Sequence, residues 1–170
     1  KSYAIVDYYV IKDGVKNFAP SVSHGITLAK FGLQDVDVVG DVNGDGVRDL
    51  VVEDMNYDGS RGVVFVIMLN TDRTVQSFTV FGHGPDFEWA GGFSFSLPAS
   101  QNFGRRVAPL GDLDGNGVPD LLVGSGSTTT PMAFILFLES NGHVGSHVVI
   151  DEHVIDTPLP LGSYFGSAVA

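Results

Sequence analysis

An acidic, glycine-containing segment occurs twice in the chain, in the same phase. Residues 39–52 read Val-Gly-Asp-Val-Asn-Gly-Asp-Gly-Val-Arg-Asp-Leu-Val-Val, and residues 110–123 read Leu-Gly-Asp-Leu-Asp-Gly-Asn-Gly-Val-Pro-Asp-Leu-Leu-Val. The first aspartates of the two copies, Asp41 and Asp112, lie 71 residues apart, and a Phe-Gly pair begins at Phe31 and again at Phe103. A repeat of this kind indicates similar structural units that bury their apolar faces against one another. We therefore expect Phe31, Phe103 and Phe165, each followed by Gly, to be buried where one unit packs on the next, with the Gly allowing close backbone approach.

The sequence around these segments is typical of short β-strands. Apolar or alternating runs of five to nine residues end in Gly, Asn or Asp, and no long stretch shows helical amphipathicity. The runs predict strands over residues 3–11, 36–42, 49–53, 62–69, 75–81, 106–110, 120–123, 133–138 and 146–150. Hairpin turns are expected at residues 12–14, 71–73 and 141–142. We therefore expect antiparallel sheets, without crossover helices and without a parallel sheet.

The repeats divide the chain into four segments. Residues 1–30 are expected to be the second half of a blade, 31–102 a complete blade with the loop 41–49, 103–164 a complete blade with the loop 112–120, and 165–170 the start of another. About four strands per repeat is the content of one propeller blade. The predicted fold is all-β, with β-propeller-type four-stranded antiparallel blades, and the propeller is incomplete in this chain. Because broken ends expose strand edges and apolar faces, we expect the chain to pack on further blades or on adjacent copies, as in a fibre.

The repeated segment has the composition of a calcium loop. Oxygen-bearing side chains stand at loop positions 1, 3, 5 and 9, and the backbone carbonyl at position 7 can add another ligand, which suits a hard cation that takes six to eight oxygens. The predicted ligands are Asp41, Asn43, Asp45, Val47 and Asp49 in the first loop, and Asp112, Asp114, Asn116, Val118 and Asp120 in the second. Gly46 and Gly117 permit the positive φ that wrapping an ion requires. The sequence thus predicts two Ca²⁺ sites.

The two alternatives to a calcium loop between strands are an EF-hand and an Asx-rich turn without an ion. An EF-hand loop carries a bidentate Glu at position 12 and lies between helices, whereas position 12 is Val52 or Val123 here and both loops run into strand-like sequence. A pair of Asx-rich turns without an ion is the simpler alternative, but two copies in identical phase favour calcium.

These motifs carry a family resemblance. Phe-Gly followed by Val-Gly-Asp-Val-Asn-Gly-Asp-Gly-x-x-Asp-Leu-x-Val resembles the FG-GAP repeat of integrin α-subunit β-propellers and related surface proteins. The usual Gly-Ala-Pro after the second strand is replaced by Glu53-Asp54-Met55 and by Gly124-Ser125-Gly126. The resemblance implies calcium-stabilised blades, an extracellular or cell-surface location, and a role in cell adhesion or in carbohydrate or protein recognition.

Composition excludes several other classes of protein. The formal net charge is −11, which opposes nucleic-acid binding. No apolar run is long enough to span a membrane, and the absence of cysteine excludes disulfides. The five histidines match no metal-ligand spacing, and no nucleophile-elbow motif occurs in a strand-to-helix context, so no catalytic residue is predicted and no enzyme activity is expected.

Two segments suggest additional ligands or modifications. The aromatic-rich residues 82–102 include Trp89, which either caps a blade core or offers a stacking platform to a sugar or a partner loop. The hydroxyl-rich residues 125–131, with a Thr128–Thr130 run, could carry O-linked glycans, and no Asn-x-Ser/Thr acceptor exists.

The leading functional hypothesis is a non-catalytic, calcium-stabilised extracellular adhesion or structural repeat module of a larger surface protein or fibre. Its expected partners are neighbouring blades or copies of the same protein, with a glycan or protein as a further candidate ligand. The alternatives are a carbohydrate-binding, lectin-like propeller and, third, an accessory domain of an enzyme.

Overall fold

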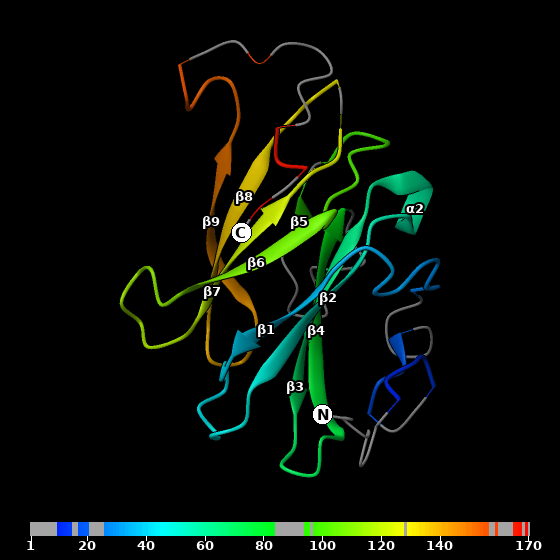
Figure 1. The fold of residues 1–170 in the computed structure, drawn as a ribbon, viewed down its shortest axis with the longest axis vertical. Helices are drawn as coiled ribbons and strands as arrows, with labels where there is room; N and C mark the ends of the chain where they lie inside the picture. Colours follow the sequence, from blue (N-terminus) through cyan, green and yellow to red (C-terminus); the bar gives the residue numbers. More distant parts are fainter. Residues whose placement is uncertain are drawn as a thin grey trace, which may run out of the picture.

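The chain folds into two antiparallel four-stranded sheets, the first of which gains a short fifth strand. A computed structural model describes residues 10–14, 17–20, 26–83, 94–95, 97–127, 129–156, 159, 165–167 and 169. The first sheet has the order β1-β2-β3-β4-β5 and the second the order β6-β7-β8-β9 (Figure 1). The strands are β1 Val36–Gly40, β2 Asp49–Asp54, β3 Val63–Leu69, β4 Val75–His83, β5 Ser94–Phe95, β6 Arg106–Gly111, β7 Asp120–Gly124, β8 Ala133–Leu138 and β9 Val144–Ile150.

The strands expected from residue 36 onward are present, with ends that differ by at most a few residues. The strand expected over residues 3–11 falls almost wholly outside the described residues. The expectation that no parallel pairing occurs was wrong, because β5 pairs parallel to β4 through Gly82 with Ser94 and His83 with Phe95. The alternation rule that located the other strands cannot find a two-residue strand, since it needs four residues or more.

One short helical segment was not expected. The element α2 spans Tyr57–Ser60, but Asp58 has φ 46° and Gly59 φ 63°, so it is a left-handed turn more than a helix. It joins β2 to β3 at one end of the first sheet (Figure 1). It carries no part of either apolar core except Tyr57, which is half-buried against the first sheet.

Strand β3 lies between two apolar cores. Its side chains alternate, so that Val64 and Val66 belong to the core between the two sheets while Phe65 and Ile67 belong to a second core on the other face. All four side chains are buried. The second core is closed by the chain before β1, which contributes Phe18 and Ile26. Figure 1 shows the described part of this segment on the side of the first sheet away from the second sheet.

The two sheets pack with opposite faces in contact. In the first sheet the cross-strand neighbours Val51 and Val66 face the second sheet. In the second sheet the side chains that face the first are those of Val107, Val123 and Phe134, which also lie in one cross-strand row. The face of one sheet therefore meets the reverse face of the next, and the arrangement is head-to-tail.

As a result, one apolar face of the second sheet is only partly covered by the described residues. Its cross-strand row is Leu122, Ile135 and Val148, which the register places in the same positions as Val51, Val66 and Thr79 of the first sheet. The first-sheet row is buried under the second sheet. The second-sheet row belongs to neither apolar core; Leu122 and Ile135 are half-buried and Val148 is 41% exposed.

The Phe-Gly pairs lie at junctions between elements, as expected, but only one of the three phenylalanines is fully buried. Phe103 is 0% exposed and its ring lies 5.1 Å from that of Phe134, whereas Phe31 and Phe165 are half-buried. A side chain on Gly104 would meet Val64 at 2.7 Å. The glycine after each Phe thus permits a close approach, while the expectation of full burial was wrong for Phe31 and Phe165, whose rings are only partly covered.

Candidate metal centre

Each acidic loop joins the first two strands of its sheet. The first loop lies between β1 and β2, and the second between β6 and β7. Gly46 and Gly117 have φ values of 86° and 87°, as predicted for the turn of the loop. Position 12 of each loop lies inside a strand, at Val52 in β2 and Val123 in β7, so neither loop has the helical flanks of an EF-hand.

The aspartate at position 1 organises the turn of each loop through backbone amides. Asp41 accepts hydrogen bonds from the amides of Asp45 at 3.0 Å and Gly46 at 2.8 Å. Asp112 does the same with the amides of Gly115 at 2.8 Å and Gly117 at 2.9 Å. Such Asx-type bonds fold each loop back on itself.

The aspartate at position 9 fastens the loop to the sheet. The carboxylate of Asp49 accepts hydrogen bonds from the amides of Val42 and Leu69, both at 2.9 Å. Asp49 is fully buried. Leu69 is the last residue of β3. The Asp49 carboxylate therefore connects the beginning of the loop to β3, although β2 separates the loop from β3 in the chain.

The second loop repeats this connection. The carboxylate of Asp120 accepts hydrogen bonds from the amides of Leu113 at 2.7 Å and Leu138 at 3.0 Å, and Asp120 is fully buried. Leu138 ends β8, as Leu69 ends β3. The two position-9 aspartates therefore have equivalent environments in the two repeats.

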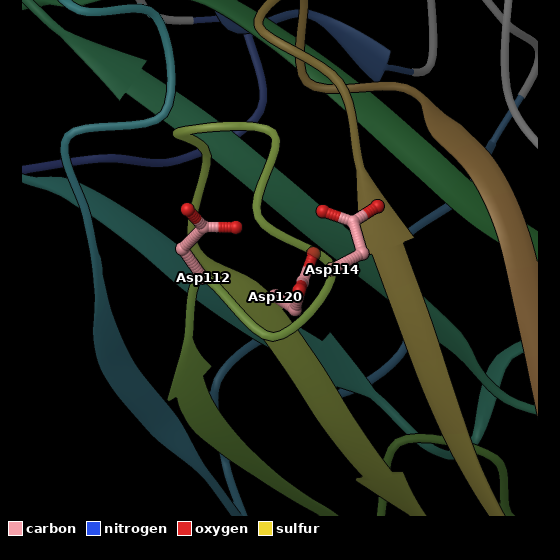
Figure 2. A group of neighbouring side chains, drawn as sticks. All are labelled: Asp112, Asp114 and Asp120. Atoms are coloured by element: carbon pink, nitrogen blue, oxygen red, sulfur yellow. The ribbon is translucent and has the colours of Figure 1, made fainter.

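Three carboxylates gather in the second loop. Ligand oxygens of Asp112, Asp114 and Asp120 lie within 4.8 Å of one another. Figure 2 shows the carboxylates of Asp112 and Asp114 on opposite arms of the loop, with Asp120 between them at the start of β7. Within the part of the chain that the structure describes, no other set of three acidic or histidine side chains is this close.

In the first loop the corresponding ligands are hydrogen-bonded rather than gathered to that distance. The amide nitrogen of Asn43 donates to Asp45 at 3.1 Å, and the amide oxygen of Asn43 accepts from the backbone of Asp45 at 3.1 Å. The second loop exchanges the two residue types, with Asp114 at position 3 and Asn116 at position 5. The carbonyl-bearing residues of position 7 also differ, because Val118 is buried and Val47 is half-buried.

The negative charges of the first loop contribute to the raised pKa of the Asp49 carboxyl. Burial raises the pKa of the Asp49 carboxyl, the amides of Leu69 and Val42 oppose the shift, and the charges of Asp45 and Asp41 add to it. A cation among these carboxylates would relieve that repulsion. The donor set is made of carboxylate, amide and carbonyl oxygens alone, which fits a hard ion such as Ca²⁺ and not a thiophilic or imidazole-seeking metal.

Two buried carboxylates were missed as functional residues by the sequence reasoning. Glu53 accepts hydrogen bonds from the amides of Gln34 at 2.7 Å, Asp35 at 3.2 Å and Met55 at 2.6 Å. Burial raises the pKa of Glu53 despite these bonds. The sequence marks this position as unusual, because Glu53-Asp54-Met55 replaces the Gly-Ala-Pro of the FG-GAP repeat.

Asp54 holds the same segment of chain from the next position. Its carboxylate accepts hydrogen bonds from the amides of Ala29 and Lys30, the latter at 2.7 Å, and a third from Asn56 at 3.3 Å. Glu53 and Asp54 together fix residues 29–35, which contain the first Phe-Gly pair, against the end of β2. They act on the fold and take no part in the acidic loop.

The two other candidate segments are the aromatic-rich residues 82–102 and the hydroxyl-rich residues 125–131. Trp89 lies outside the described residues. In the hydroxyl-rich segment, Ser125 and Ser127 are buried, and the Ser125 hydroxyl accepts a hydrogen bond from the amide of Gln101 at 2.9 Å. A buried, hydrogen-bonded hydroxyl is not accessible for glycosylation, whereas Thr129 is exposed, so a glycan on the threonine run stays a prediction.

A small cavity adjoins that segment. It has a volume of about 240 Å³, and its lining includes Thr129, Thr130, Asp151, Glu152 and His153. This volume is below the roughly 300–1,000 Å³ of typical small-molecule sites. Among the described residues, its lining contains no Phe, Tyr or Trp that could stack on a sugar ring.

Comparison with known proteins agrees with the repeat pattern. The chain is similar to human integrin alpha-IIb. The two sequences are 33% identical over 138 residues, which cover 75% of this chain and 12% of the integrin. The chain therefore spans about an eighth of the length of the curated relative it matches. No protein-family model matches the chain. Among the described residues, no helix is long and apolar enough to cross a membrane.

Proposed function

We propose that the chain is a non-catalytic, calcium-stabilised repeat module of an extracellular adhesion or structural protein. The observation that carries the proposal is a feature that both acidic loops share. In each loop the aspartate at position 9 accepts one hydrogen bond from the loop itself and one from the end of β3 or β8. A loop whose only task is to turn the chain needs no such concentration of carboxylates. The similarity to integrin alpha-IIb supports the calcium, the adhesive role and the cell-surface location.

Calcium would act in this module as a structural ion. Positions 1, 3, 5 and 9 supply side-chain oxygens from Asp41, Asn43, Asp45 and Asp49, and their counterparts in the second loop do the same. Because position 9 also bonds the end of β3 or β8, an ion in the loop is coupled to the sheet. Loss of the ion should therefore loosen the strands and not the loop alone.

The partner in this proposal is a further repeat of the same kind. The row Leu122, Ile135 and Val148 occupies the positions that the second sheet covers on the first sheet. Moreover, Gly166 approaches the end of the second sheet so closely that an added side chain would lie 2.2 Å from the carbonyl of Met132. Phe165-Gly166 thus begins to cover the second sheet at its end, as Phe103-Gly104 does on the first. A succession of such sheets would build the blades of a propeller or of a fibre.

Calcium titration of the purified chain tests the proposal. Isothermal titration calorimetry should report two calcium ions per chain. The melting temperature should be higher in millimolar calcium than in chelator, since a ligand at a hundredfold excess over its Kd stabilises the native state by about 2.7 kcal/mol. The double variant Asp45→Ala with Asp114→Ala should lose most of this response. Identical melting in chelator and in calcium would refute the proposal.

A further inference from the structure

The amide of Asn43 is held from outside its own loop. Its nitrogen donates a hydrogen bond to the side-chain oxygen of Gln76 at 2.6 Å, the shorter of its two donated bonds. Gln76 is the second residue of β4, and it is exposed. In the first sheet β4 is separated from β2 by β3, so this bond reaches the loop from two strands away.

The direction of this bond decides which atom of Asn43 is offered to a cation. An asparagine side chain can ligate a hard cation only through its oxygen, while its nitrogen carries two hydrogens. Gln76 accepts one of these hydrogens and thereby fixes the nitrogen toward β4. The oxygen of Asn43 then lies on the loop side, where it accepts a hydrogen bond from the backbone of Asp45 at 3.1 Å.

The second loop also anchors the nitrogen of an asparagine, although its asparagine stands at position 5 and not at position 3. The amide nitrogen of Asn116 donates to the backbone carbonyl of Leu138 at 2.8 Å, and its oxygen accepts from the amide of Val118 at 2.7 Å. The position equivalent to Gln76 is Gly145, because Val75 and Val144 pair in the same register with the ends of β3 and β8. Both loops thus anchor the nitrogen of their asparagine, the first through a side chain and the second through the main chain.

We propose that Gln76 is a positioning residue for the cation site of the first loop. It orients the Asn43 amide so that both nitrogen hydrogens are taken, one by Gln76 and one by the Asp45 carboxylate, and the oxygen is the atom left for the ion. This inference rests on the proposed function, because it requires the first loop to bind calcium. It predicts that the calcium affinity of the first loop depends on Gln76, which contributes no ligand. The calcium affinity of the second loop should not depend on Gln76.

The experiment measures each loop separately with calcium alone as the probe. The Asp114→Ala chain reports the first loop and the Asp45→Ala chain the second. Adding Gln76→Ala should weaken calcium binding about tenfold or more in the Asp114→Ala chain, the range seen when residues that orient a metal ligand are removed. It should leave binding unchanged in the Asp45→Ala chain.

Two further variants distinguish positioning from a general effect on the sheet. Gln76→Glu keeps an acceptor oxygen and should restore most of the affinity lost in Gln76→Ala. Ser77→Ala, at the next exposed position of β4, should change nothing. The melting temperature in chelator should be the same for the Gln76→Ala chain and its parent, since Gln76 is exposed.

The outcomes separate the two proposals. If the Asp114→Ala parent binds no calcium, the proposed function fails for the first loop, and the role of Gln76 fails with it. If the parent binds calcium but Gln76→Ala leaves the Kd unchanged, only the positioning role is overturned. Equal losses in Gln76→Ala and Gln76→Glu would also overturn it, because the acceptor oxygen would then be irrelevant.

Discussion

At the scale of single residues, the acidic side chains of each loop fall into two groups. Asp114 is exposed and its carboxylate lies in the open loop. Asp120 is fully buried, and both of its oxygens accept backbone hydrogen bonds. Asp114 accepts hydrogen bonds only within its own loop and would serve the proposed ion, whereas Asp120 also completes the hydrogen bonding of the sheet. The two roles can be separated by mutation.

Asp120→Ala should destabilise the chain even in chelator, whereas Asp114→Ala should not. Removing the Asp120 carboxylate leaves the amides of Leu113 and Leu138 without their acceptor, and the buried Leu138 donor alone should cost about 1–3 kcal/mol. Urea unfolding in chelator measures the effect. A loss of less than about 1 kcal/mol for Asp120→Ala, or an equal loss for both variants, would contradict this division of roles.

Glu53 should make stability depend on pH. Its pKa is raised in the folded protein by burial, so the folded state binds the proton more tightly than the unfolded chain. The stability it contributes is therefore fully present below about pH 4.3, the ordinary value for Glu, and is lost as the pH rises through the raised pKa. Relative to Glu53→Gln, the wild type should lose unfolding free energy as the pH rises above about 4.3.

The measurement is a series of urea titrations of both proteins in calcium-free buffer, from about pH 4.3 upward. Taking the difference between them cancels the contribution of Asp49, whose pKa is raised as well. A difference that is constant, or that grows in favour of the wild type as the pH rises, would show that burial does not dominate at Glu53.

At the scale of elements, the junction of the two repeats depends on a close backbone approach. Gly62, at the start of β3, faces Phe103 so closely that a side chain on Gly62 would lie 2.1 Å from the Phe103 carbonyl. The amide of Phe103 donates to the carbonyl of Arg61 at 2.8 Å. The Phe-Gly pair of one repeat is thus fixed to the strand entry of the previous one.

Gly62→Ala should weaken this junction strongly. The added side chain must displace backbone, and the φ of 90° adds strain of its own. Gly14→Ala is the matched control, because Gly14 has a φ of 78° with nothing within 4 Å of the added atom. The melting temperature of Gly62→Ala should fall well below that of Gly14→Ala. Equal melting temperatures would mean that the junction yields without cost.

Much of this element scale could be predicted from the sequence, and the exceptions have physical causes. A continuous apolar run located β3 because both of its faces are buried, and the spacing of Asp and Gly located both loops. The parallel pair at β5 is too short for any periodicity. Glu53 and Asp54 were missed because a carboxylate in a strand looks solvent-exposed in sequence, and only the fold brings the amides of Gln34 and Lys30 to it. Gln76 was missed for the same reason, since its contact spans 33 residues.

At the scale of the whole molecule, the two sheets are stacked head-to-tail. The face that carries Val51 and Val66 meets the reverse face of the second sheet, and the equivalent face of the second sheet is left with an exposed Val148. A heterologous contact of this kind does not close on itself in two steps and instead generates rings or open assemblies. This partly covered face should therefore control self-association.

Val148→Lys should reduce self-association of the 170-residue chain. A lysine at the β9 end of the apolar row would have to lose its hydration if another sheet covered it. Ser140→Lys, at an exposed turn, adds the same charge elsewhere and should have little effect. Analytical ultracentrifugation over a range of concentrations compares them. If wild type and Val148→Lys sediment alike as monomers, the face does not mediate association under these conditions.

The head-to-tail contact also has an evolutionary consequence. Each sheet presents one kind of face to its predecessor and the complementary kind to its successor, with matching residues at matching register positions. A duplicated gene segment that encodes one such unit would arrive with both surfaces already compatible with its neighbours. Lineages could lengthen or shorten the array by copying or deleting units, and selection would then be free to differentiate individual loops. The pair of loops described above, with Asn43 anchored by a side chain and Asn116 by the main chain, is what such divergence after copying would leave behind.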